Sequence, residues 1–126
     1  MIAVRRHALT YTLLIMCADM QSMPPTDAQV DQAVGTLAML ADPTRIRLLW
    51  ALLDGELPVH DLAATAGCSA TSASQHLAKL RLAGLVRHRR DGRQVLYRAE
   101  DAHVRRLLRE ALYHADHAVQ KHPDHA

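Results

Sequence analysis

Apolar residues recur every three or four positions between residues 30 and 41, which is the spacing of one helix face. These apolar positions are Val30, Val34, Leu37 and Ala41. Residues 26–29 read Thr-Asp-Ala-Gln, an order that has the form of a capping box at a helix start.

A second helix is predicted to start at Asp42 and Pro43, because Asp is a favoured N-cap and Pro fits the first helical position. Its inward positions, before an end near Gly55, are Ile46, Leu49, Trp50 and Leu53.

Two shorter helices are predicted next, and a glycine ends each of them. The first covers about residues 60–66 and stops at Gly67. Ser69 caps the second, which ends at Gly84 because glycine readily adopts the left-handed conformation found just past a helix end. The apolar side of this fourth helix consists of Ala73, Leu77 and Leu80.

The helical period ends at residue 85. Residues 85–90 and 93–97 are predicted as strands, and Asp91 and Gly92 between them form a strong signal for a two-residue hairpin turn. Asp101 then opens a last helix, whose apolar stripe consists of Val104, Leu108, Ala111, Ala115 and Ala118. This order of elements predicts a mainly α fold with a small β-hairpin wing (α+β), as in a winged helix-turn-helix protein.

We expect three segments: an N-terminal extension of residues 1–25, a domain of residues 26–121 and a His-rich tail of residues 122–126. The extension contains a short basic and apolar run that faintly resembles an export signal. An alternative is that the true start is Met20 or Met23. No segment is long enough to span a membrane, so no membrane partner is expected. The two cysteines have no CxxC spacing, which favours a reducing cytoplasm.

Basic residues are concentrated in one stretch of a chain whose formal net charge is only +2. Residues 69–98 contain seven of the fifteen Lys and Arg residues and a single acidic residue, Asp91. Such a patch favours a surface that faces a polyanion, the alternative being an ordinary solvated face. The fourth helix combines an apolar side with a small polar side, as a helix in a DNA major groove requires. The candidate DNA-binding residues are Thr71, Ser72, Ser74, Gln75, His76 and Lys79 on this helix, and Arg87, Arg89, Arg90 and Arg93 on the hairpin.

Several motifs in this part of the chain resemble the ArsR/SmtB family of repressors. They are Leu-Ala-Asp-Pro-Thr-Arg at residues 40–45, Ser-Gln-His-Leu-Ala-Lys-Leu at residues 74–80, Asp-Gly-Arg at residues 91–93 and Leu-Tyr-Arg at residues 96–98. The resemblance covers about residues 30–120 and implies a homodimer formed through the first and last helices. It also implies binding to operator double-stranded DNA, an inverted repeat, and release when an effector is sensed.

Histidine is frequent near the C-terminus, where five of the nine histidines follow residue 102. His114 and His117 share a helix face, and His103 lies on the same face about 16 Å further along the axis. Because metal–nitrogen bonds are about 2 Å long, one helix cannot bring all three to one ion. Two antiparallel copies can, if Asp101 and His103 of one chain meet His114 and His117 of the other. This arrangement predicts two equivalent sites in a two-fold dimer.

The family resemblance extends to this spacing. Asp-x-His followed by His-x-x-His matches the last-helix site of the zinc and nickel/cobalt sensors, which implies as metal ligands Asp101, His103, His114 and His117. Three imidazoles and one carboxylate suit tetrahedral zinc or cobalt. Further oxygen or nitrogen ligands would favour six-coordinate nickel, and the candidates are Asp116, His122 and His125. We therefore expect Ni(II) or Co(II), somewhat ahead of Zn(II), as a regulatory effector, with no catalytic cofactor.

These features together predict a cytoplasmic metal-responsive repressor that is not an enzyme. One alternative keeps the repressor and replaces the metal by another effector. A metallohydrolase is disfavoured because the chain has no His-Glu-x-x-His motif. A metal-storage module is disfavoured because it would have no use for a basic hairpin.

Overall fold

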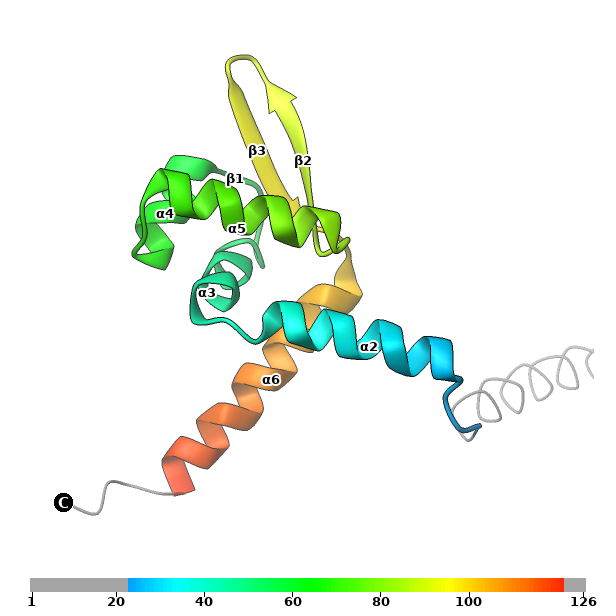
Figure 1. The fold of residues 1–126 in the computed structure, drawn as a ribbon. Helices are drawn as coiled ribbons and strands as arrows, with labels where there is room; N and C mark the ends of the chain where they lie inside the picture. Colours follow the sequence, from blue (N-terminus) through cyan, green and yellow to red (C-terminus); the bar gives the residue numbers. More distant parts are fainter. Residues whose placement is uncertain (1–22, 122–126) are drawn as a thin grey trace, which may run out of the picture. The chain divides into compact units, whose positions relative to one another are not determined.

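The computed structural model describes residues 23–121. In chain order the elements are α2 (Asp27–Leu40), α3 (Pro43–Ala51), β1 (Leu57–Pro58), α4 (Val59–Ala66), α5 (Ala70–Leu82), β2 (Val86–Asp91), β3 (Gln94–Ala99) and α6 (Ala102–Lys121) (Figure 1). Contacts divide the chain within α2 into two compact units, residues 1–33 and residues 34–126. The second unit contains the helix-turn-helix, the hairpin and α6. The predicted fold class, mainly α with a small β-hairpin wing, is confirmed.

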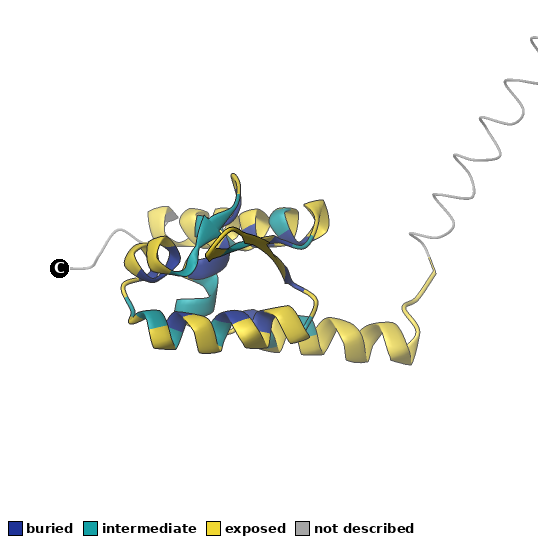
Figure 2. Ribbon diagram, turned by 90° about the horizontal axis from the view of Figure 1, so that it is seen from above, coloured by how far each residue is buried: buried dark blue, intermediate teal, exposed yellow. Residues whose placement is uncertain are grey.

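The helix α2 starts with the predicted capping box. The N–H of Thr26 donates to Oε1 of Gln29 at 2.9 Å, and the N–H of Gln29 donates to Oγ1 of Thr26 at 3.2 Å. Most of the helix is exposed, and only its last residue, Leu40, is buried (Figure 2). The exposed positions include the apolar side chains predicted from the sequence, namely Val30, Val34 and Leu37.

Side-chain caps start α3 and α5 where the sequence predicts them. Oδ2 of Asp42 accepts the N–H of Arg45 at 2.9 Å, and Oγ of Ser69 accepts the N–H of Ser72 at 3.0 Å. The hydrogen bond from Arg45 lowers the pKa of Asp42 and outweighs desolvation, which acts in the opposite direction. Between these caps, α4 ends at Gly67, whose φ of +69° lies in the left-handed region that favours glycine.

A leucine-rich core lies between α3, α4 and α5, and the hairpin and α6 add to it. The largest fully buried side chains are Leu48, Leu49, Leu52, Leu62, Leu77, Leu80, Leu108 and Val86. The prediction that Trp50 points inward is wrong, because its side chain is 53% exposed. Helix geometry gives the reason: at about 100° per residue, Trp50 lies on the opposite side of α3 from Leu48, and Leu48 faces the core instead.

The hairpin strands β2 and β3 form a three-stranded antiparallel sheet with β1, in the order β1-β3-β2. β1 was not predicted, because a strand of two residues is too short to show an alternating pattern. Asp91 pairs with Gln94, so the turn consists of Gly92 and Arg93 and not of the predicted Asp91 and Gly92. The φ of Gly92 is +62°, which suits the first position of a two-residue hairpin loop.

The helix α6 is partly anchored in the core and otherwise exposed. Val104 and Leu108 are buried, and Leu112 is half-buried. Every residue from 113 to 120 is exposed. The predicted apolar stripe therefore includes three residues that this chain leaves uncovered, Ala111, Ala115 and Ala118.

No helix within residues 23–121 is long and apolar enough to cross a membrane. The predicted segment boundaries stay predictions, because most of the N-terminal extension and the whole His-rich tail lie outside the described residues.

Candidate DNA-binding surface and metal-ligand helix

The outward side of α5 carries the polar side chains that were predicted to read DNA. The helix buries Ala73, Leu77 and Leu80, and this fixes which side faces outward. Four of the predicted residues are exposed and two are half-buried: Thr71, Ser74, Gln75 and Lys79 are exposed, and Ser72 and His76 are half-buried. A helix of this kind offers hydroxyl and amide groups to base edges and phosphates.

His76 differs from its neighbours because it contacts another helix. Its Nδ1 lies 3.3 Å from Nη1 of Arg45, at the start of α3. Nε of Arg45 also donates to the carbonyl of Met39, in the last turn of α2, at 2.6 Å. The ring of His76 is therefore held at the edge of the predicted DNA face, and its contact with DNA stays a prediction.

The four hairpin arginines predicted to bind DNA fall into two pairs, and a fifth arginine of the hairpin, Arg98, lies opposite Arg87. Arg87 forms an ion pair with Glu100, with both Nε and Nη2 at 2.6 Å from Oε1. Arg89 forms an ion pair with Glu56, in the segment between α3 and β1, with an Nη2–Oε2 distance of 2.8 Å. The other two, Arg90 and Arg93, are exposed and form no ion pair within residues 23–121. Arg90 and Arg93 therefore lie at the hairpin tip, next to the turn, whereas Arg98 on β3 is exposed further from the tip and also forms no ion pair within the described residues.

Glu56 and Glu100 are functional neighbours that the sequence reasoning missed. The hydrogen bonds from Arg89 lower the pKa of Glu56, and the same contact raises the pKa of Arg89. Glu100 could have been found from the hairpin register, since Arg87 faces Arg98 and Glu100 is the diagonal neighbour two residues further on. Glu56 is 33 residues from Arg89 and left no local signal.

Asp101 caps α6 and faces its first amides. Its Oδ1 accepts the N–H of His103 at 2.9 Å and the N–H of Val104 at 3.0 Å. These bonds, chiefly the one from Val104, lower the pKa of Asp101 despite some desolvation. The carboxylate is therefore charged at neutral pH, as a metal ligand must be.

The three histidines predicted as metal ligands are all exposed along α6. The ring of His117 packs edge-on against Tyr113, with 4.6 Å between ring centroids. Asp116, a candidate additional ligand, accepts a hydrogen bond from Gln120 at 2.9 Å. In the part of the chain that the structure describes, no three His, Cys, Asp or Glu side chains come together as a metal site. The assignment of Asp101 and these histidines as ligands stays a prediction that needs a second chain.

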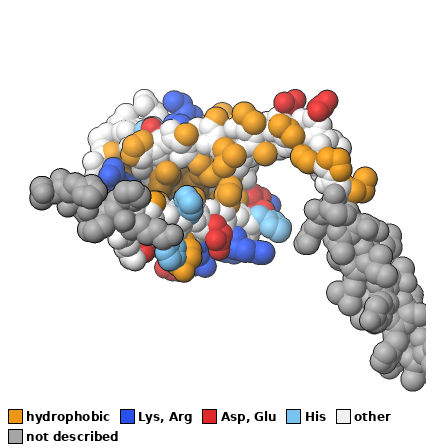
Figure 3. Space-filling view, turned by 90° about the horizontal axis from the view of Figure 1, so that it is seen from below, with side chains coloured by type: hydrophobic (Ala, Val, Ile, Leu, Met, Phe, Trp, Pro, Cys, Tyr) orange, Lys and Arg blue, Asp and Glu red, His pale blue; other side chains and the backbone are white. Residues whose placement is uncertain are grey.

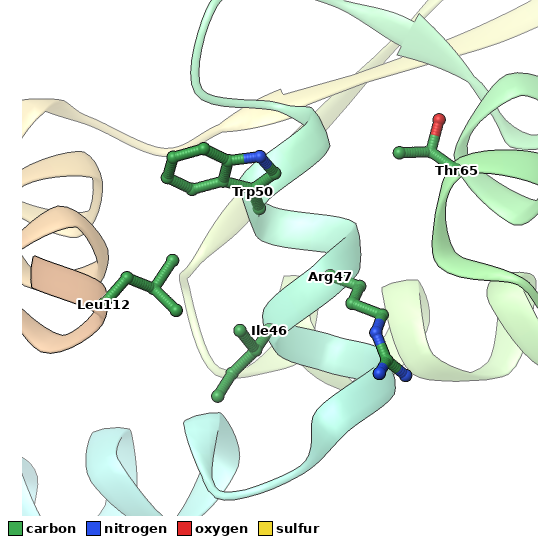
Figure 4. Close-up of a pocket in the computed structure, with 5 residues that line it drawn as sticks. All are labelled: Ile46, Arg47, Trp50, Thr65 and Leu112. Atoms are coloured by element: carbon green, nitrogen blue, oxygen red, sulfur yellow. The ribbon is translucent and has the colours of Figure 1, made fainter. Parts of the chain in front are cut away.

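An open apolar groove runs between α3 and α6. Ile46 and Trp50 of α3 and Leu112 of α6 point toward one another across it (Figure 4). The groove encloses about 380 Å³, and Arg47 and Thr65 complete its lining. Figure 3 shows apolar side chains gathered on one face of the molecule, with histidines beside them. Sequence reasoning missed the groove because it assigned Trp50 to the core.

Comparisons with known proteins agree with this geometry. A helix-turn-helix domain family matches residues 40–89. The chain is 49% identical over 110 residues to the HTH-type transcriptional regulator KmtR of Mycobacterium tuberculosis, covering 87% of this chain and 85% of KmtR. It is 44% identical over 94 residues to NmtR of the same organism, another HTH-type transcriptional regulator, covering 74% and 78% of the two chains.

A solved structure gives the same fold. It is a homodimeric winged helix-turn-helix DNA-binding domain from Mycobacterium bovis, described as a possible ArsR-family transcriptional regulator. The TM-score is 0.69 at 32% sequence identity, and the match covers 81% of this chain and 97% of the other.

Proposed function

This chain belongs to the ArsR/SmtB family of winged helix-turn-helix transcriptional regulators, and we propose that it is a repressor released from its operator by Ni(II), Co(II) or Zn(II). Membership makes it a DNA-binding regulator and not an enzyme. The observation that carries the metal proposal is the exposed row of His103, His114 and His117 on α6, with Asp101 ionised at its start.

The proposed site lies between two chains. His103 and His114 are eleven residues apart on one helix, so about 16 Å separates them along the axis. An antiparallel second α6 brings Asp101 and His103 of one chain to His114 and His117 of the other. The exposure of residues 113–120 supports this, because nothing in the described part of the same chain covers them.

Apolar surface supports the proposed homodimer. Side chains that a soluble monomer would ordinarily cover are exposed on α2, α3 and α6, namely Val34, Leu37, Trp50, Tyr113 and Val119. Exposed apolar side chains that lie together are typical of an interface, and Trp50 and Tyr113 line one hollow with Leu112. The solved relative from Mycobacterium bovis is itself described as homodimeric.

In the proposed mechanism the metal-free dimer places both copies of α5 in successive major grooves of an inverted repeat. Metal cross-links the two copies of α6 and favours a dimer geometry that fits the operator poorly. Coupling between effector and operator in such systems is typically about 1–3 kcal/mol, which corresponds to about 5- to 150-fold in affinity. By linkage, DNA weakens metal binding by the same factor.

The metal is expected to be Ni(II) or Co(II) ahead of Zn(II). Asp116 is exposed beside His117 and is available as an additional oxygen ligand, which six-coordinate nickel favours over tetrahedral zinc. His122 and His125 lie outside the described residues. Deleting residues 122–126 is expected to weaken nickel binding more than zinc binding, and equal losses would contradict the preference for nickel.

A metal-by-metal release assay tests the proposal. A labelled duplex selected for binding to the metal-free dimer is titrated with protein, once with each metal ion and once with a chelator in place of the metal. Wild type is expected to release with nickel or cobalt, while His103→Ala and His117→Ala bind the duplex but do not release. His60→Ala is the matched control, since His60 is an exposed histidine outside α6. Release that persists in the α6 variants would refute the metal role, and binding without release by any metal would favour a non-metal effector.

A further inference from the structure

Arg45 joins three helices of the DNA-binding unit. It lies in the first turn of α3, where its own N–H is held by Asp42. Its Nε donates to the carbonyl of Met39 near the end of α2, at 2.6 Å. Its Nη1 lies 3.3 Å from Nδ1 of His76, in the middle of α5. One half-buried side chain thus spans from the end of α2 to the helix that carries the predicted DNA face.

The chemistry of this contact defines the state of the imidazole. A guanidinium can only donate hydrogen bonds, so Nδ1 of His76 must accept and the ring proton must sit on Nε2. An apolar side chain in place of His76 would leave Nη1 of Arg45 without this acceptor. Loss of Arg45 would likewise leave His76 with no tie to α3 among the hydrogen bonds of the described residues.

The position of His76 on α5 gives the contact its mechanical effect. Leu77 and Leu80 are fully buried and hold α5 against the core through apolar packing, which is non-directional. A hydrogen bond at the edge of the helix is directional and resists rotation of α5 about its axis. Such rotation would swing exposed Gln75, the residue before His76, away from a base edge. Side chains that read DNA need support of this kind to hold their geometry.

We propose that Arg45 and His76 are positioning residues for operator binding, through which the end of α2 sets the orientation of α5 on DNA. This inference rests on the DNA-binding function of the family and does not depend on the metal. It differs from the prediction that His76 itself contacts DNA. In our proposal His76 acts through α5, and its effect requires Arg45.

A double-mutant cycle in chelator-treated, metal-free buffer distinguishes these roles. The variants are Arg45→Met, His76→Leu and the double variant, and the probe is the labelled duplex selected with wild type. Arg45→Met keeps the backbone N–H that Asp42 caps and removes both side-chain donors. Each single variant is expected to bind about 5- to 20-fold more weakly, and the double variant no more weakly than the poorer single one. His76→Asn keeps an acceptor near the position of Nδ1 and should restore binding to within about threefold of wild type.

Controls separate positioning from loss of fold. Arg90→Met lies at the hairpin tip, so its effect should multiply with that of Arg45→Met. Amide hydrogen exchange on the DNA-free variants should accelerate across α5 and not across β2 and β3, whereas general destabilisation would accelerate both. If Arg45→Met does not fold, Arg45→Lys serves in its place, because a single ammonium cannot replace the guanidinium fork at both partners.

Three results would overturn the proposal. The first is wild-type affinity in Arg45→Met together with weak binding in His76→Leu, which would mean that His76 contacts DNA directly. The second is a double variant whose loss is the product of the two single losses. The third is His76→Asn binding as weakly as His76→Leu. A failure of metal-induced release would leave all three measurements valid, because no metal is present in them.

Discussion

Arg89 holds both carboxylate oxygens of Glu56. Its Nε lies 3.0 Å from Oε1 and 2.9 Å from Oε2, and its Nη2 lies 2.8 Å from Oε2. This fork joins β2 of the wing to the segment between α3 and β1. Arg87 forms an ion pair with Glu100 through a single carboxylate oxygen, Oε1. Of the four wing arginines predicted to bind DNA, Arg89 thus ties the hairpin to another segment and Arg87 pairs at its base, whereas Arg90 and Arg93 have no ion pair within residues 23–121 and are free to meet phosphate.

The salt dependence of DNA binding should separate the two pairs of arginines. Each phosphate contact releases about one condensed counterion, so the loss of one contact reduces the magnitude of the negative slope of log K against log salt by about 1. Because the proposed dimer carries two copies of each residue, Arg90→Ala and Arg93→Ala are each expected to lower the magnitude of the slope by about 2. Arg87→Ala and Arg89→Ala should change it less, because these side chains already have a carboxylate partner. Anisotropy titrations at four or five salt concentrations measure the slopes.

Glu56→Gln is the matched test of the Arg89–Glu56 ion pair. The substitution frees Arg89 without removing a cation, so the magnitude of the salt slope should increase or stay constant, while the hairpin loses its ion pair to the segment before β1. Equal slope changes for all four arginine variants would contradict the division into arginines held in ion pairs and arginines that contact phosphate.

Asp101 has two separable roles, because it caps α6 and is predicted to bind metal. Asn caps helices about as well as Asp but has no charge. Asp101→Asn is therefore expected to keep the melting temperature of the metal-free protein and to lose metal affinity by about tenfold or more. Asp101→Ala should lower both. Calorimetric metal titrations and thermal melts measure the two quantities, and unchanged metal affinity in Asp101→Asn would remove Asp101 from the ligand set.

Acid should weaken the fold partly through Asp42. The hydrogen bond from the N–H of Arg45 holds the pKa of Asp42 below its ordinary value of 3.8 in the folded state. The unfolded state therefore binds the proton more readily, and the stabilisation is complete above pH 3.8 and is lost as the pH falls through the folded pKa. Asp42→Asn keeps a cap that does not titrate. Its urea midpoint should fall less than that of wild type between pH 5 and pH 3, and parallel falls would contradict the assignment.

The helices and the two hairpin strands could be predicted because each has a local signal, which the two-residue strand β1 lacks. Thr26 and Gln29 cap each other as their spacing implies, and Ser69 and Asp101 accept the expected amides. Gly67 ends α4 with a positive φ, the conformation that made glycine a recognisable signal for a helix end. The hairpin turn is shifted by one residue, since Gly92 suits the first turn position as well as the second.

Features that depend on partners distant in sequence could not be predicted. Trp50 is apolar and at helical spacing, so its sequence signal is the same for a core position and for an exposed groove. The Arg89–Glu56 and Arg45–His76 contacts join residues 33 and 31 positions apart, for which periodicity carries no information. The metal site is harder still to derive, because the spacing of its ligands predicts that the site is completed by a second chain.

Two complementary variant proteins test whether the metal ligands come from two chains. One protein carries Asp101→Ala and His103→Ala, and the other carries His114→Ala and His117→Ala. In either homodimer every site would keep only half of its ligands, so neither protein alone is expected to bind metal tightly.

Mixing the two proteins at equal concentration, with time for subunit exchange, should restore binding in the heterodimer. There, Asp101 and His103 of the second protein meet intact His114 and His117 of the first, while the other site has lost all four ligands. Random pairing makes half of the dimers mixed, each with one site, so about a quarter of the wild-type metal capacity should return. Metal titration followed by the absorbance of bound Co(II) measures that capacity. If the ligands of each site came from one chain, both proteins would remain defective after mixing, and a mixture that recovers no capacity would refute the shared site.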